Sequence, residues 1–122
     1  MPEETYEASA SNSPARFDWY YGKKLADPKL QTCAASAGWG KNAIAATWRV
    51  GKARNVQKIQ IPVLLFQAGN DAFVKNEAQD EFAARVPSCT LRKMPGLRHE
   101  LFFSDKETLQ KYWGQIFDFY EK

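Results

Sequence analysis

The spacing of hydrophobic residues along the chain changes near residue 59. Before this point, apolar side chains recur every three or four residues, which is typical of short amphipathic helices. After it, short continuous apolar runs alternate with helical spacing, in the order strand, helix, strand, helix. The pattern therefore predicts an α/β protein with two regions, residues 1–58 and residues 59–122.

Two helices are predicted in the first region. Ser13 and Pro14 have the form of an N-cap followed by a proline in the first turn, and Asp27-Pro28 ends this helix. A second helix is predicted from Asn42 to about Gln57, with Gly51 weakening its middle. Both helices carry large aromatic side chains. We interpret these aromatic residues as core, with a lid over an apolar substrate as the alternative.

A βαβ unit followed by a long helix is predicted in the second region. Residues 61–66 form an unbroken apolar run, typical of a strand that is buried on both faces of a parallel sheet. Residues 77–85 have helical spacing, and residues 89–94 form a second short strand. The last helix is predicted to begin after Ser104 as N-cap, with Glu107 completing a capping box.

The last helix needs a larger sheet than these strands supply. Its apolar residues lie on one face, and a face of this size is expected to pack against a sheet. Two parallel strands do not make a stable open sheet by themselves. We therefore expect the remaining strands to come from outside these residues and the isolated chain to associate. The apolar face consists of Leu109, Tyr112, Trp113, Ile116, Phe117 and Tyr120.

Composition narrows the possible partners. The 122 residues include 17 basic and 14 acidic side chains, which are scattered rather than clustered, and this argues against a nucleic-acid partner. A single histidine and carboxylates without ligand spacing predict no metal site, and we expect no cofactor. The chain has no apolar run of the roughly 20 residues that an integral membrane segment needs.

Two features favour a cytoplasmic protein, with peripheral contact with a membrane as an alternative. The N-terminal segment is polar and lacks the apolar core of a signal peptide. The two cysteines, Cys33 and Cys89, lie far apart in unlike contexts and form neither a disulfide framework nor a metal motif.

Two ionisable residues follow the predicted strands. Asp71 comes a few residues after the first strand, and His99 comes a few residues after the second. Because the carboxyl ends of adjacent parallel strands meet at one edge of a sheet, the two side chains are expected to lie together. There the carboxylate would orient the imidazole through one ring nitrogen while the other acts as general base. Taken singly, Asp71 could cap the next helix and His99 could be a half-buried structural residue, but their joint placement favours the pair.

Short motifs surround both positions. Residues 69–74 read GNDAFV, residues 96–100 read GLRHE, and the two ionisable residues are separated by 99 − 71 = 28 positions. This combination resembles the C-terminal part of α/β-hydrolases, especially the serine hydrolases of the lysophospholipase and monoacylglycerol lipase branch. In that family the triad acid lies in a G-x-D-x-x-V context and the triad histidine in a G-x-x-H turn before the last helix. The resemblance implies that Asp71 and His99 are the acid and the base of a catalytic triad.

The resemblance also implies an architecture. It covers residues 59–122 and corresponds to the last βαβα unit of the mostly parallel sheet of an α/β-hydrolase. More loosely, residues 12–28 and 39–48 look like the helical cap that this branch inserts before its last strands. Residues 1–58 would then be a partial cap or lid, and residues 59–122 the C-terminal part of the core.

The family's nucleophile is missing from this sequence. In the family it lies upstream of the cap in a G-x-S-x-G turn, and no such motif occurs here. Ser36 lies between small residues, but it follows a polar segment broken by proline and is a weak candidate. Cys33 and Cys89 have the chemistry of nucleophiles, although their positions favour structural roles.

We therefore expect the C-terminal piece of a serine carboxylic-ester hydrolase, inactive alone because its nucleophile lies outside these residues. The resemblance implies a lipid-like or small ester substrate, such as a lysophospholipid or a monoacylglycerol. The partner would be the missing N-terminal part of the hydrolase or a second copy of the chain. Two alternatives stay open: a non-catalytic interaction module that keeps a hydrolase half-fold, and another α/β-hydrolase such as a peptidase or a simple carboxylesterase.

Overall fold

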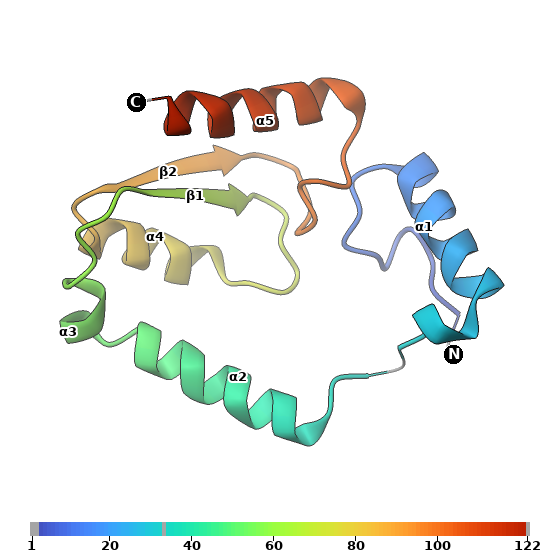
Figure 1. The fold of residues 1–122 in the computed structure, drawn as a ribbon, viewed down its shortest axis with the longest axis horizontal. Helices are drawn as coiled ribbons and strands as arrows, with labels where there is room; N and C mark the ends of the chain where they lie inside the picture. The colour runs from blue at the N-terminus through green and yellow to red at the C-terminus, as the bar shows by residue number, and fades with distance from the viewer. Residues whose placement is uncertain (1–2, 33, 122) are drawn as a thin grey trace.

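A small parallel sheet lies between two helices in the second half of the chain (Figure 1). The structure, a computed structural model, describes residues 3–32 and 34–121. Strand β1 (Val63–Ala68) pairs in parallel with strand β2 (Cys89–Met94). Helix α4 (Asn76–Arg85) connects the strands on one side of the sheet, and helix α5 (Lys106–Tyr120) lies on its other side. The predicted order of strand, helix, strand and helix is therefore confirmed.

The two strands align along their whole length. Val63 is opposite Cys89 and Ala68 is opposite Met94, so both strands end at the same edge of the sheet. β1 starts two residues later than the apolar run predicts, because Pro62 has no N–H for a sheet hydrogen bond. The Val63 N–H makes the first such bond, donating to the Ser88 carbonyl at 3.1 Å.

Burial along β1 differs from the prediction. Residues 63–66 are half-buried, and only Gln67 and Ala68 are buried. The expectation of a strand buried on both faces along its whole length is wrong here. Its physical cause is the width of the sheet, since the described part of the chain supplies two strands and leaves the outer edge of β1 uncovered.

The first helix forms as its sequence predicts. α1 (Pro14–Ala26) begins after Ser13, whose hydroxyl oxygen accepts a hydrogen bond from the Arg16 N–H. The helix ends at Asp27, and the side chain of this aspartate caps a short 3-10 turn, η1 (Pro28–Leu30).

The second predicted helix is two helices. α2 (Ala37–Val50) begins five residues earlier than predicted, because the Ser36 side chain caps it. Gly51 ends α2, and a separate turn, α3 (Ala53–Val56), follows. Gly51 therefore divides the predicted helix rather than weakening its middle, in line with the low helix propensity of glycine.

The large aromatic residues of the first region are unequally buried. Phe17 is buried, but Trp19, Trp39 and Trp48 are 66%, 64% and 68% exposed. The interpretation of the aromatic residues as core is wrong for these three tryptophans. For Trp39 and Trp48 the reason is that α2 runs apart from the sheet (Figure 1). The buried apolar residues of the described chain are Phe17, Val56, Ala68, Val86 and Leu101.

The N-cap of α5 is Asp105 rather than Ser104. One carboxylate oxygen of Asp105 accepts from the Thr108 N–H at 2.9 Å, and the other accepts from the Thr108 hydroxyl at 2.8 Å. Ser104 is fully buried and its hydroxyl has no hydrogen-bond partner in the described structure, so the predicted capping box with Glu107 does not form. Among the helices of residues 3–32 and 34–121, none has the length and apolar character to cross a bilayer.

Candidate active site

The loops that follow β1 and β2 bring Asp71 and His99 into contact. His99 Nδ1 lies 2.8 Å from Asp71 Oδ2. The Asp71 side chain is 3% exposed, whereas the His99 side chain is 43% exposed. The carboxylate is thus held inside the protein while the ring faces solvent, and the pair lies at the sheet edge where both strands end.

Asp71 divides its two oxygens between the loop and the histidine. Oδ1 accepts hydrogen bonds from the N–H groups of Phe73 at 2.8 Å and Val74 at 3.0 Å, and Oδ2 faces the imidazole. Burial works to raise the pKa of Asp71, but the hydrogen bonds from His99, Phe73 and Val74 outweigh it, so the pKa lies below its ordinary value. The carboxylate is therefore ionised at neutral pH and acts as an acceptor.

An ionised acceptor fixes which ring nitrogen of His99 carries the proton in the neutral imidazole. Because Asp71 accepts, Nδ1 of His99 carries a proton and donates it in the hydrogen bond. Nε2 makes no hydrogen bond within the described residues, and the Phe73 ring lies beside the imidazole with 5.3 Å between ring centroids. In this tautomer Nε2 has a free lone pair, which is the state that a general base requires.

Two glycines allow the turn that precedes His99. Gly96 has φ of 74°, a left-handed conformation that favours glycine. A Cβ on Gly69 would lie 2.9 Å from Pro95 Cα, so the loop after β1 touches this turn directly. Two backbone hydrogen bonds join the two loops. The Gly69 N–H donates to the Met94 carbonyl at 2.9 Å, and the Asn70 N–H donates to the Leu97 carbonyl at 2.8 Å. The two loops are thus packed into one unit.

Asn12 clamps the backbone on both sides of His99. Its Nδ2 donates to the carbonyls of Arg98 and Glu100, each at 3.1 Å, and its Oδ1 accepts from the Arg98 N–H at 2.5 Å. Ser11 also forms an isolated parallel bridge with Glu100. The sequence pattern did not predict this role of Asn12. Its partners Arg98 and Glu100 lie 86 and 88 residues further along the chain, and no local pattern marks contacts over such a range.

The Arg98 side chain ties the same loop to the N-terminal segment. Its Nη1 donates to the carbonyls of Tyr6, Ser9 and Ser11 at 2.6, 3.4 and 3.3 Å. The guanidinium carbon also lies 4.6 Å from the centre of the Tyr6 ring, within the range of a cation–π contact. The position of His99 therefore depends on residues from the first region.

The two candidate nucleophiles that the structure describes, Ser36 and Cys89, do not join this pair. The Ser36 hydroxyl accepts from the Trp39 N–H at 3.1 Å and serves as the N-cap of α2. Cys89 begins β2, at the strand end opposite His99, and burial raises the pKa of its thiol, which disfavours the reactive thiolate. Cys33 lies outside the described residues.

Comparison with known proteins identifies a match to a protein family. A model of the family described as serine aminopeptidase, S33, matches residues 3–107. The match spans the helices of the first region, the βαβ unit and the loop that carries His99. No curated protein and no solved structure gives a significant match.

Proposed function

Because the chain belongs to the serine aminopeptidase family of α/β-hydrolases, and so to the serine hydrolases, we propose that Asp71 and His99 are its triad acid and base. The observation that carries the proposal is their 2.8 Å hydrogen bond, between a buried carboxylate and an exposed ring. In the complete enzyme, a serine hydroxyl would attack the substrate carbonyl carbon while Nε2 of His99 takes its proton. His99 would then give that proton to the leaving alcohol, and water would repeat the cycle on the acyl-enzyme. Asp71 would orient the ring throughout and would stabilise the imidazolium in the steps in which it forms.

The nucleophile is proposed to lie outside these residues. This is supported by the absence of a G-x-S-x-G motif from the sequence and by the helix-capping role of Ser36. The related expectation that further strands join this sheet is supported by a groove of about 390 Å³ between β1 and α5, whose lining includes Val63, Phe66 and Ile116. In this proposal residues 59–122 complete the C-terminal part of a hydrolase core, and residues 1–58 form part of its cap.

The proposed substrate is a carboxylic ester with an apolar acyl chain, such as a lysophospholipid or a monoacylglycerol. The exposed tryptophans Trp19, Trp39 and Trp48 support this, because large aromatic surfaces on a cap suit an apolar chain. A peptide amide is the second candidate, and the description of the matching family favours it. The same acid and base serve both reactions.

The missing nucleophile is tested by intact-mass measurement after exposure of the folded chain to a fluorophosphonate, which traps activated serines. We expect no adduct on the wild type. A single adduct that disappears in Ser36→Ala would overturn the proposal that the nucleophile lies elsewhere.

The pairing of Asp71 with His99 is tested by the rate at which diethyl pyrocarbonate acylates the only histidine, followed by mass. We expect Asp71→Asn to slow acylation several-fold, because the Asp71 carboxylate accepts the hydrogen bond from Nδ1 of His99 and so keeps the lone pair on the exposed Nε2. Asp118→Asn, an exposed aspartate of α5, is the matched control and should react like the wild type. Equal rates in all three proteins would contradict the role of Asp71.

A further inference from the structure

The two peptide units on either side of His99 are held by the N-terminal segment. On one side, Asn12 Nδ2 donates to the Arg98 carbonyl at 3.1 Å. On the other side, the Glu100 N–H donates to the Ala10 carbonyl at 3.0 Å. The φ and ψ angles of His99 are the rotations between these two planar units. The contacts with residues 10 and 12 therefore fix the direction in which the imidazole leaves the backbone.

The Arg98 side chain joins the histidine loop to an earlier part of the same segment. Its Nη1 donates to the Tyr6 carbonyl at 2.6 Å, and its guanidinium carbon lies 4.6 Å from the centre of the Tyr6 ring. Because a guanidinium group is planar and rigid, it makes a directed hydrogen bond and a ring contact on the same residue. A lysine at this position would keep the charge but would not reproduce this geometry.

The other end of the segment is attached to helix α1. The Glu4 carboxylate forms an ion pair with Lys24, and Lys24 Nζ also donates to the Tyr20 hydroxyl at 2.9 Å. The hydrogen bonds from Lys24 to Glu4 and Tyr20 raise the pKa of its ammonium group above the ordinary range, so the group stays charged. The Glu4 N–H adds a contact to the same helix, since it donates to the Tyr21 hydroxyl at 3.3 Å.

Burial makes this ion pair a firm attachment. Lys24 is 8% exposed, whereas the neighbouring Lys23 lies at an exposed position of the same helix. A buried charge is strongly disfavoured once its partner is removed, so Lys24 and Glu4 stay together in the folded chain. The pair therefore ties the start of the segment to α1.

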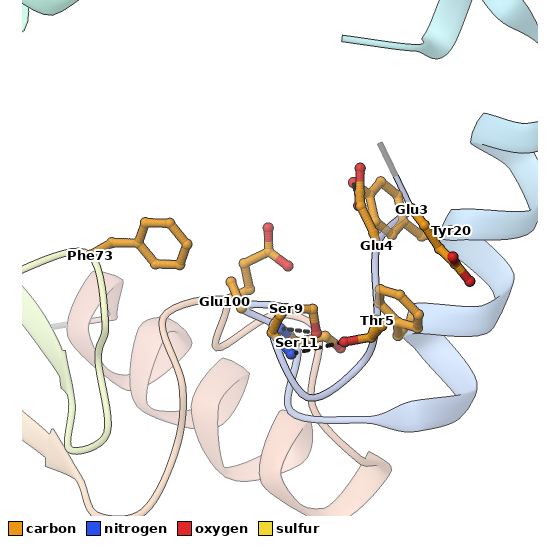
Figure 2. Close-up of a pocket in the computed structure, with 11 residues that line it drawn as sticks. Glu3, Glu4, Thr5, Ser9, Ser11, Tyr20, Phe73 and Glu100 are labelled. Atoms are coloured by element: carbon orange, nitrogen blue, oxygen red, sulfur yellow. Dashed lines mark hydrogen bonds between the residues drawn. The ribbon is translucent and has the colours of Figure 1, made fainter. Parts of the chain in front are cut away.

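Between these two attachments, the segment runs along a cavity of about 410 Å³ (Figure 2). Its residues from Glu4 to Ser11 contribute to the lining, together with Tyr20 of α1. Phe73, whose ring lies beside the His99 imidazole, lies across the cavity from Tyr20 (Figure 2). The segment thus connects α1 with the histidine loop along one wall of this cavity.

We propose that residues 4–12 form a positioning arm that holds the general base from α1. Arg98 and Lys24 are its positioning residues, because Arg98 attaches the arm to the histidine loop and Lys24 attaches it to the helix. The inference rests on the proposed function for the role of His99 as the base. It adds that the orientation of the imidazole depends on a lysine that lies 99 − 24 = 75 positions earlier. A displacement of α1 would then move the imidazole away from Asp71.

The proposal is tested by NMR of the ring nitrogens of His99, the only histidine of the chain. In the neutral imidazole, the nitrogen that carries the proton has a different ¹⁵N shift from the other one, and the hydrogen bond to Asp71 selects Nδ1. We expect this tautomer to dominate in the wild type. Its population should fall about twofold or more in Lys24→Met and in Arg98→Lys, because a released ring mixes both tautomers. Arg98→Lys keeps the charge, so a change there reports geometry.

Two variants are the matched controls. Lys23→Met removes the same charge from an exposed position of α1, and Arg92→Lys makes the same exchange at an exposed position of β2. Both should keep the wild-type ring signals. Wild-type ring signals in Lys24→Met and Arg98→Lys would overturn the proposal, and so would an equal loss of the Nδ1–H tautomer in the controls.

A second measurement needs no variant, so it decides the question even where a substitution prevents folding. Amide hydrogen exchange of the wild type reports the contacts between the arm and the histidine loop. The Glu100 N–H donates to the Ala10 carbonyl, and the Asn12 N–H donates to the Phe103 carbonyl. Detachment of the arm releases both, so the two amides should open with the same free energy. Clearly different opening free energies would overturn the proposal that the arm acts as a unit.

The same ring signals separate this inference from the proposed function. Asp71→Asn should reverse the tautomer, because its amide oxygen would keep the two N–H donors of its own loop and its NH₂ group would then face Nδ1. A reversal there without any change in Lys24→Met and Arg98→Lys would overturn the arm and support the acid–base pair. An unchanged tautomer in Asp71→Asn would instead contradict the acid–base pair of the proposed function.

Discussion

At the residue scale, the carboxylate of Asp71 supports both its own loop and the imidazole. Its pKa lies below the ordinary value of 3.8, so the folded protein binds its proton less readily than the unfolded chain does. The stabilisation from this group is therefore fully present above the unfolded pKa and is lost as pH falls through the folded value. The stabilisation depends on pH in this direction because folding lowers the pKa of Asp71.

We predict that the unfolding free energy of Asp71→Asn falls less between neutral and acidic pH than that of the wild type. At neutral pH the variant should lose about 1–3 kcal/mol of unfolding free energy, the scale for a buried charged hydrogen-bonding group. Below about pH 4 the difference from the wild type should shrink, because Asp71 of the unfolded wild-type chain then binds a proton before the folded one does, and this lowers the wild-type unfolding free energy. Urea midpoints measured at neutral and acidic pH check this. A difference that grows on acidification would contradict it.

Asn12 acts on the site through the backbone. We predict that Asn12→Ala costs about 1–3 kcal/mol, because it leaves the Arg98 N–H and two carbonyls without their partner. Amide hydrogen exchange in residues 98–100 should become faster. Asn42→Ala, at an exposed position of α2, is the control and should leave exchange in this loop unchanged. Unchanged exchange in Asn12→Ala would mean that Arg98 and the bridge between Ser11 and Glu100 hold the loop without the Asn12 side chain.

At the element scale, the turn between β2 and His99 depends on the left-handed backbone of Gly96. We predict that Gly96→Ala destabilises the protein by about 1–2 kcal/mol, the cost of placing a Cβ in this conformation. Gly22→Ala is the same substitution inside α1, where nothing lies within 4 Å of the added Cβ, and it should stabilise by up to about 1 kcal/mol. Thermal unfolding of both variants checks the opposite signs. Destabilisation by both would show that helix propensity does not decide the effect in α1.

Elements were predictable where one local signal dominated. The Ser13-Pro14 start of α1 and the bounds of β2 agree with the sequence, because capping chemistry and the apolar run have no local competitor there. The α5 N-cap was misassigned because two good capping residues are adjacent. Tertiary packing decides between them, since Ser104 is fully buried and Asp105 is free to cap.

For the candidate site as well, one part could be predicted from the sequence and another part could not. The contact between Asp71 and His99 follows from topology, because two parallel strands that start and end in register deliver their loops to one edge. The burial of β1 could not follow from its own residues, since it depends on strands beside it. Asn12 was missed because its partners lie 86 and 88 residues away, beyond the reach of any periodic pattern.

At the scale of the whole molecule, the chain exposes more surface than its size requires. Its accessible surface is 9073 Å², whereas a compact protein of 13.9 kDa is expected to expose about 6,700 Å². The excess of roughly 2,400 Å² is of the size that an obligate interface buries. Large apolar side chains contribute to the exposed surface, and on α5 Trp113 is 46%, Phe117 60% and Tyr120 81% exposed.

We predict that the isolated chain self-associates and that Phe117→Lys reduces this association, because it places a charge on the apolar face of α5. Gln110→Lys, at an exposed position of the same helix, adds the same charge and should have little effect. Sedimentation velocity over a range of concentrations measures the difference. A wild-type chain that stays monomeric at high concentration would contradict the expectation of an incomplete fold.

The clamp between the N-terminal segment and the histidine loop also has a consequence for the order of folding. Joining residues separated by 86 positions costs about 4 kcal/mol in loop-closure entropy, estimated as (3/2)RT ln n. Contacts of such long range tend to form late, after the local βαβ unit has assembled. The imidazole would then reach its final orientation only in the last step, so a folding intermediate would already have its sheet and would not yet have an ordered His99.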